Sequence, residues 1–191
     1  MLGVSRETHD RLRCYVACVE RWNPTINLIS ARSMSDIWER HIADGVAIAT
    51  LLADRPGSAA DLGSGAGIPG LVAAIVTGRA ITLVEADRRK AAFLTEAARE
   101  TGAPVLVLPA RAETCALNDQ AIVMARALAP LNRLLTLCAP LMNSFSRGLF
   151  FKGQDAAQEV AQARRTFAFD LIHHTIGSSL ILEVTHITPA A

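Results

Sequence analysis

Short apolar runs alternate with helical stretches through most of the chain, and this alternation predicts an α/β fold. The runs AADL, ITLVE, VLVL, AIVMA and GLFF have the length of buried strands. The segments at about 68–77, 88–101, 130–141 and 155–165 carry apolar residues at helical spacing. Strands and helices that alternate at this pitch form a mainly parallel sheet covered by helices on both faces.

The two ends of the chain depart from this alternation. One apolar face near the N-terminus follows helical spacing: Leu12, Tyr15, Val16 and Val19. The segment NPTINLIS is expected to end that helix because Pro24 lacks a backbone donor, and a second amphipathic helix is expected from about Ser35 to Leu52. At the C-terminus the strand-like runs FAFDLIHHTI and SSLILEVTHI are joined by GS, which predicts a hairpin with an antiparallel last strand.

The composition is that of one globular domain. The chain has 191 residues, 51% of them hydrophobic, which is enough for a core that folds alone. We expect a single domain over 1–191, made of an N-terminal helical segment (1–54) and a core (55–191). The formal charge is only +1, so a polyanionic partner must be bound by a local patch. Lys90 and Lys152 are the only lysines, and the other basic residues are arginines.

The cysteines and histidines give no sign of a disulfide framework or a metal site. The four cysteines form no C-x-x-C pair, and Cys14 and Cys18 are spaced to share one helix face. His173 and His174 are consecutive on a strand and point to opposite faces, so no metal is expected. With no signal peptide and no apolar run of about 18 residues, the sequence predicts a soluble, cytoplasmic protein.

The segment DLGSGAGIPG, residues 61–70, follows the first predicted strand and indicates a ligand-binding loop. Gly63, Gly65 and Gly67 allow positive φ angles and close approach of a ligand to the backbone. In a doubly wound sheet the ligand lies at the carboxyl ends of the strands, beside the first strand. Glu85 ends the second strand about twenty residues after Gly65, where an acid accepts hydrogen bonds from both ribose hydroxyls. Folds that bind NAD and folds that bind S-adenosylmethionine share these features.

Three features favour S-adenosylmethionine as the ligand. Asp61 directly follows the strand and gives the form D-x-G-x-G-x-G, in which a carboxylate suits a sulfonium and would repel a pyrophosphate. The closing hairpin is the usual end of the methyltransferase fold. A Ser/Tyr/Lys set for hydride transfer is not evident, since the single tyrosine, Tyr15, lies in the N-terminal helix. A nicotinamide-dependent oxidoreductase remains one alternative, and a non-catalytic RNA-binding factor that keeps the donor fold is the other.

The segment ARALAP after the fourth strand constrains the methyl acceptor. It lacks the [DNS]-P-P-[YFW] loop common in enzymes that methylate exocyclic amines, and it lacks the cysteine nucleophile required for carbon-5 pyrimidine methylation. Arg126 stands there instead, and an arginine at the mouth of a site suits a phosphate, a carboxylate or a guanine edge. A ring nitrogen needs no deprotonation, so the lack of an evident general base is consistent with such an acceptor.

Seven motifs together resemble the RsmG (GidB) family. They are RWNPTINLIS, ERHIADG, DLGSGAGIPGL, LVEADRRKAAFL, ARAET, ARALAPLNRLL and FFKGQ, and they stand in the family's order from about Arg21 to Thr185. The resemblance implies a class I S-adenosylmethionine-dependent methyltransferase with a Rossmann-like fold. It also implies methylation of guanine N7 in the 530 loop of 16S ribosomal RNA, at guanine 527, on a small ribosomal subunit or an assembly intermediate, by a monomer.

The resemblance also implies roles for individual residues. Gly63 and Ile68 match the family's donor loop, Glu85 its ribose acid, and Arg126 the arginine between donor and acceptor. The expected donor-binding residues are Asp61, Gly63, Gly65, Gly67, Ile68, Glu85, Ala86, Ala112, Glu113 and Arg126. The expected catalytic residues are Arg126 and Lys152. The expected RNA-binding residues are Arg32, Arg40, His41, Arg88, Arg89 and Lys152. Arg40, His41 and Asp44 match an RHxxDS element in which Gly45 replaces the serine.

Overall fold

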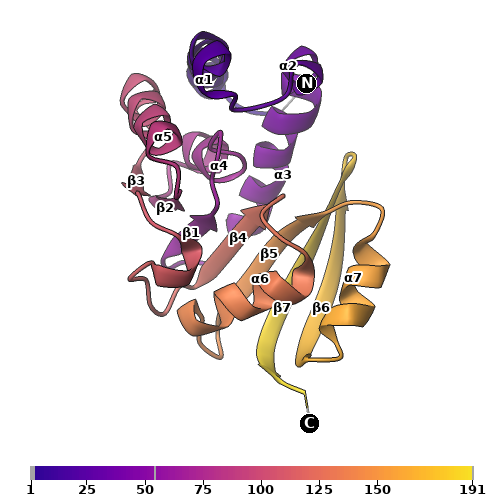
Figure 1. The fold of residues 1–191 in the computed structure, drawn as a ribbon. Helices are drawn as coiled ribbons and strands as arrows, with labels where there is room; N and C mark the ends of the chain where they lie inside the picture. Colours follow the sequence, from indigo (N-terminus) through magenta and orange to yellow (C-terminus); the bar gives the residue numbers. More distant parts are fainter. Residues whose placement is uncertain (1–2, 54, 191) are drawn as a thin grey trace.

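The structure, a computed structural model, describes residues 3–53 and 55–190 and has one seven-stranded sheet at its centre (Figure 1). The strands are β1 (Ala59–Leu62), β2 (Ile81–Val84), β3 (Val105–Leu108), β4 (Ile122–Arg126), β5 (Arg147–Lys152), β6 (Phe167–Ile176) and β7 (Ser179–Pro189). Their order in the sheet is β3-β2-β1-β4-β5-β7-β6. The first five strands are parallel and β7 is antiparallel to both β5 and β6, which confirms the predicted sheet and its closing hairpin.

Helices cover both faces of the sheet and complete three layers (Figure 1). The helices are α1 (Arg6–Ile26), α2 (Ala31–Ser35), α3 (Ala43–Leu52), α4 (Gly70–Thr77), α5 (Arg88–Thr101), α6 (Leu131–Cys138) and α7 (Ala156–Ala163). On one face α1, α3, α4 and α5 pack against sheet residues such as Leu83 and Met124. On the other face α6 and α7 pack against residues such as Val123 and Phe150. Adjacent strand residues thus face opposite layers, as expected of a sheet buried on both sides.

The first helix does not break where the sequence predicted. It continues through Pro24 to Ile26 and ends at Asn27, whose φ is 49°. Pro24 lies in the last turn of the helix, so its missing N–H removes a single helical hydrogen bond, the one to the carbonyl of the exposed residue Glu20. A proline in the last turn therefore costs little here.

The second predicted helix, from about Ser35 to Leu52, is observed from Ile37 to Leu52, but it does not begin as an α-helix. Its first part, Ile37–Ile42, is π-helical and continues directly into α3, while the separate short helix α2 precedes it. A π turn spans five residues, and Ile37 and Ile42, which are five apart, are both buried. Such segments are frequent at functional sites, and this one carries His41.

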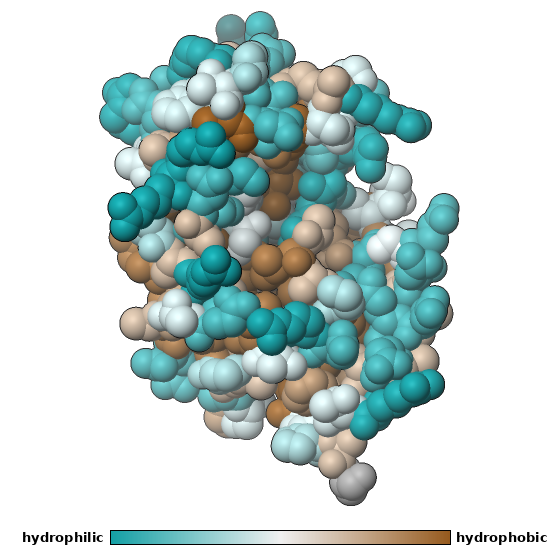
Figure 2. Space-filling model, in the orientation of Figure 1, coloured by the Kyte–Doolittle hydropathy of each residue, from teal (hydrophilic) through white to brown (hydrophobic). Residues whose placement is uncertain are grey.

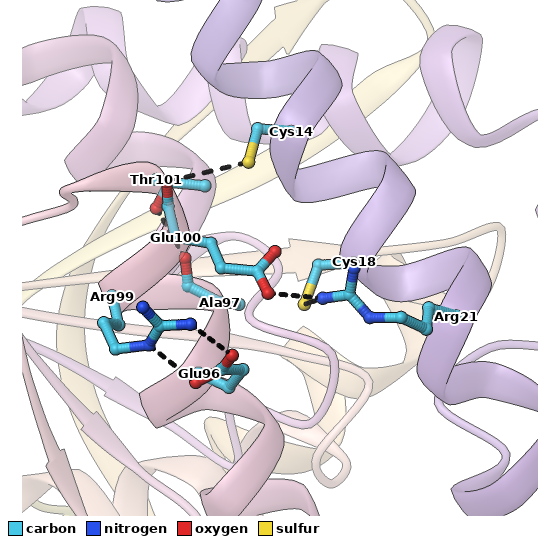
Figure 3. Close-up of polar contacts among 8 residues, drawn as sticks. All are labelled: Cys14, Cys18, Arg21, Glu96, Ala97, Arg99, Glu100 and Thr101. Atoms are coloured by element: carbon cyan, nitrogen blue, oxygen red, sulfur yellow. Dashed lines mark hydrogen bonds and ion pairs between the residues drawn. The ribbon is translucent and has the colours of Figure 1, made fainter.

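The helix α1 is joined to α5 by polar contacts (Figure 3). Arg21 Nη2 lies 2.5 Å from Glu100 Oε1, and the Cys14 thiol donates to Glu100 O at 3.6 Å. Cys14 and Cys18 share one face of α1, as their spacing predicted; this face lies toward α5, and all four cysteines are free thiols. Over the described ranges, none of the helices is both long and apolar enough to cross a membrane.

Candidate active site

Three glycines shape the loop between β1 and α4. Gly63, Gly65 and Gly67 have φ angles of 68°, 55° and 85°, a conformation that other residues rarely adopt. The backbone N–H groups of Gly63 and Ser64 both donate to Val84 O, at 2.9 and 3.1 Å. The loop is therefore tied to the carboxyl end of β2 and stands at the sheet edge where ligand binding was predicted.

Asp61 lies beneath this loop. Its side chain is fully buried, and Oδ2 accepts a hydrogen bond from the Gly70 N–H at 3.0 Å. A Cβ atom on Gly70 would lie 2.6 Å from that oxygen, so the contact requires glycine. Burial raises the pKa of Asp61 to about 7, and hydrogen bonds from Gly70 and Ser64 offset part of the effect. In this structure Asp61 fixes the start of α4 and does not line the donor cavity, so its direct contact with the donor stays a prediction.

Glu85 reaches back from the end of β2 to the same loop. Its Oε2 accepts from the Gly65 N–H and its Oε1 from the Asp87 N–H, both at 2.8 Å. Each carboxylate oxygen has two lone pairs, so both oxygens can also accept a hydrogen bond from a ribose hydroxyl. The carboxylate is thus held in place before any ligand arrives, which fits the ribose role expected of it.

A cavity of about 330 Å³ opens in front of the glycine loop, and we call it the donor cavity. The predicted residues that line it are Gly63, Gly65, Glu85, Ala86, Ala112 and Glu113. Two predicted residues lie behind the loop instead. Ile68 is buried in the core, and a Cβ on Gly67 would lie 2.8 Å from Leu71 Cβ. Both residues shape the loop, and their direct contact with the donor stays a prediction.

Sequence reasoning missed several lining residues of the donor cavity: Val84, Lys90, Ala110, Arg111, Leu128 and Leu137. The apolar ones look like ordinary core positions in the sequence, and Lys90 looks like part of a solvated helix start. The apolar residues among them give the cavity apolar walls, which suit a flat purine, while Glu85 suits a ribose. The glycine loop, the carboxylate of Glu85 and the apolar walls of the cavity together fit S-adenosylmethionine.

A second cavity, of about 750 Å³, adjoins the first and is called here the acceptor cavity. Ala127 and Leu128 line both cavities and form the wall between them. Arg126, from the end of β4, lines the acceptor side, and its Nε lies 2.8 Å from Asp44 Oδ2 of α3. The Ser179 hydroxyl, at the start of β7, donates to the other Asp44 oxygen. The N-terminal helices and the closing hairpin thus meet at the predicted catalytic arginine.

His41 lines the acceptor cavity and is 4% exposed. Both of its ring nitrogens are buried without a hydrogen-bond partner among the described residues. Burial, followed by the charges of Arg126 and Arg40, lowers the pKa of His41 to about 4. The imidazole is therefore neutral at physiological pH, and a neutral ring suits a base edge better than a phosphate.

Lys152 does not extend into solvent as a grip on phosphate would require. Its side chain is 6% exposed, and Nζ donates to Glu159 Oε2 at 2.7 Å and to Ala129 O at 2.9 Å. The ammonium borders the acceptor cavity but is already engaged with the protein. Lys152 thus contacts the loop that carries Ala127 and Leu128, and its predicted roles in RNA binding and catalysis stay predictions.

The remaining predicted RNA-binding residues are exposed. Arg32, Arg88 and Arg89 lie on the surface, and Arg40 borders the acceptor cavity. Hydrophilic side chains cover much of the face drawn in Figure 2, and apolar ones show through near its middle. Exposure is necessary for contact with RNA but does not establish it, so these four roles stay predictions.

Several solved structures with a similar fold are methyltransferases. Magnesium protoporphyrin IX methyltransferase from Synechocystis, solved with bound SAM, aligns with a TM-score of 0.63 over 96% of this chain and 99% of that one, at 14% identity. A ribosomal protein L11 methylase from Lactobacillus delbrueckii subsp. bulgaricus aligns with a TM-score of 0.61 over 74% and 77%, at 17% identity. The chain therefore has the class I S-adenosylmethionine-dependent methyltransferase fold.

The family model described as "GidB: rRNA small subunit methyltransferase G" matches residues 8–187, and the chain belongs to this family. A ribosomal RNA small subunit methyltransferase G from Rhodospirillum centenum is 44% identical over 190 residues, covering 98% of this chain and 88% of the relative. One from Methylorubrum extorquens is 46% identical and covers 97% and 92%. The resemblance found in the sequence is confirmed, and the nicotinamide alternative is set aside.

Proposed function

We propose that the chain transfers a methyl group to N7 of a guanine in the 530 loop of 16S ribosomal RNA, at guanine 527. The donor is S-adenosylmethionine, which when bound supplies an electrophilic methyl group. We further propose that the chain acts as a monomer in the cytoplasm, on a small ribosomal subunit or an assembly intermediate. The family supports ribosomal RNA as the substrate, and the acceptor cavity supports the ring nitrogen.

The choice of guanine N7 as the methylated atom rests on one observation: the acidic side chains in the acceptor cavity are paired with basic ones. Its two described carboxylates are Asp44, paired with Arg126, and Glu159, paired with Lys152. The lowered pKa of His41 makes the imidazole a weak base. The described lining thus offers no free general base, which an exocyclic amine or a hydroxyl would need. Guanine N7 has its own lone pair and needs none.

The protein's contribution to this reaction is placement. The bond between N7 and the methyl carbon forms as the bond between that carbon and the donor sulfur breaks, and the sulfur keeps the electron pair. No proton moves, so the rate depends on the approach of the two reactants at the wall between the cavities. Glu85 holds the donor side, and Arg126 faces the acceptor side. The neutral His41 avoids adding a positive charge beside the purine that becomes cationic.

Mapping of the methylated atom tests the proposal. Small ribosomal subunits lacking the modification are incubated with the protein and labelled S-adenosylmethionine, and the RNA is then reduced and treated with aniline. This treatment cleaves the RNA strand at N7-methylguanine. Label without cleavage would refute N7 as the acceptor, and cleavage elsewhere would refute the position. Donor binding without any transfer would favour the non-catalytic RNA-binding alternative.

A further inference from the structure

The loop between β4 and α6, residues 127–130, has a strained backbone at the site. Ala127 has a φ of 54°, in the left-handed region that alanine rarely occupies. Residues in such conformations persist only where the surrounding structure holds them, and they concentrate at functional sites. Leu128, the next residue, lies against the glycine loop between β1 and α4, because a Cβ on Gly63 would be 2.6 Å from Leu128 Cδ1. The conformation of this loop therefore sets the wall between the two cavities.

Two charged side chains hold this loop from outside it. Lys152 Nζ donates to Ala129 O at 2.9 Å and to Glu159 Oε2 at 2.7 Å. The same Glu159 oxygen accepts a hydrogen bond from the Leu131 N–H at 2.6 Å. One carbonyl and one amide on either side of Pro130 are thus bound to a single ion pair.

The ion pair also replaces a missing helix cap. α6 begins after Pro130, which makes no side-chain cap hydrogen bond, so the first N–H groups of the helix need another acceptor. Glu159 of α7 supplies it, and its negative charge suits a helix N-terminus. The side chain of Lys152 is almost completely buried, and the ammonium finds its two protein acceptors there.

We propose that Lys152 and Glu159 are positioning residues that hold the strained loop in place and so fix the wall between donor and acceptor cavities. We call this ion pair, with its hydrogen bonds to the loop, the latch. The inference rests on the proposed function for its effect on catalysis, while the latch itself is a property of the protein alone. It assigns Lys152 to the loop and not to an RNA phosphate. A latch and a phosphate contact respond differently to salt, to loss of Glu159 and to relief of the strain at Ala127.

The test compares Lys152→Ala, Glu159→Ala and the double variant with the wild-type chain. Arg99→Ala is the matched control, because Arg99 forms an exposed ion pair with Glu96 on α5, away from both cavities (Figure 3). Three quantities are measured: hydrogen exchange at the Leu131 amide, kcat on small ribosomal subunits at saturating donor, and the slope of log KM for the subunits against log salt concentration. If an alanine variant does not fold, Glu159→Gln, which keeps an acceptor oxygen, takes its place.

On our proposal each single variant lowers kcat by about tenfold to a hundredfold, because a small misplacement of the reacting groups lowers the rate by up to about a hundredfold. The double variant is no worse than the single ones, because all of them open the same latch. Exchange at Leu131 speeds up, and the salt slope stays at the wild-type value. Adding Ala127→Gly restores part of the lost kcat, since glycine adopts the loop conformation without strain. The control matches the wild type throughout.

Two results would overturn the latch. One is a salt slope that falls by about 0.7–0.9 in Lys152→Ala, the contribution of one phosphate contact, while Glu159→Ala keeps the wild-type kcat. The other is unchanged exchange at Leu131 in both single variants. If the wild-type chain methylates no ribosomal RNA, the proposed function fails instead, and the exchange measurement still decides the latch.

Discussion

Replacement of Arg126 by lysine tests the catalytic role proposed for this arginine. A guanidinium offers five donors in a planar fork, and Arg126 forms an ion pair through Nε, which lies 2.8 Å from Asp44 Oδ2. The ion pair does not involve the two terminal nitrogens, and the side chain, which lines the acceptor cavity, is 22% exposed. A lysine ammonium can pair with Asp44 or reach the acceptor, but it cannot present a fork.

We expect Arg126→Lys to keep the fold and the charge and to lose methyl transfer by roughly two orders of magnitude, or about 3 kcal/mol of barrier. The assay is single-turnover methylation of small ribosomal subunits at saturating donor, with Arg99→Lys as the control for an arginine outside the site. A rate within about threefold of wild type would mean that Arg126 supplies charge only, and the placement argument would be wrong.

Three further substitutions test the donor loop and its supports. Glu85→Ala should weaken S-adenosylmethionine binding by about 1–3 kcal/mol in a calorimetric titration, with Glu85→Gln affected less because it keeps an acceptor; unchanged affinity would refute the ribose assignment. Asp61→Asn tests the raised pKa. Because the pKa of Asp61 is about 7 in the folded chain and ordinarily 3.8, the wild type loses stability relative to this variant as pH rises from 4 through 7. Each pH unit in that range changes the difference in free energy of unfolding between the two proteins by up to about 1.4 kcal/mol. Urea unfolding of both proteins at pH 5 and at pH 8 measures this difference. If it is the same at both pH values, the raised pKa of Asp61 is contradicted. Gly45→Ser, which restores the residue of the resembled element, should lower the free energy of unfolding by about 1–3 kcal/mol in urea unfolding, since a Cβ there would lie 2.3 Å from Val72 Cγ1. Unaltered stability would mean that α3 and α4 can separate at no cost.

Local patterns in the sequence determined the sheet, the closing hairpin and the donor loop. An apolar run of strand length and an apolar stripe of helical spacing each report how a short segment meets the core, so β1 to β5 and α4 to α7 are found close to their predicted limits. Gly63, Gly65 and Glu85 could be assigned for a similar reason. Their roles depend on backbone conformation and on the end of a strand, both of which are local.

Only the tertiary structure decided which polar groups meet. Ser179 and Asp44, which are 135 positions apart in the sequence, are hydrogen-bonded, and Asp44 in turn anchors Arg126. No periodicity reports such a contact, because it arises only when α3, β4 and the hairpin pack together. The same holds for Lys152, whose charge suggested an RNA contact until its burial beside Glu159 was known. A charged residue looks alike in sequence whether it faces solvent or a buried partner, and the fold alone makes that choice.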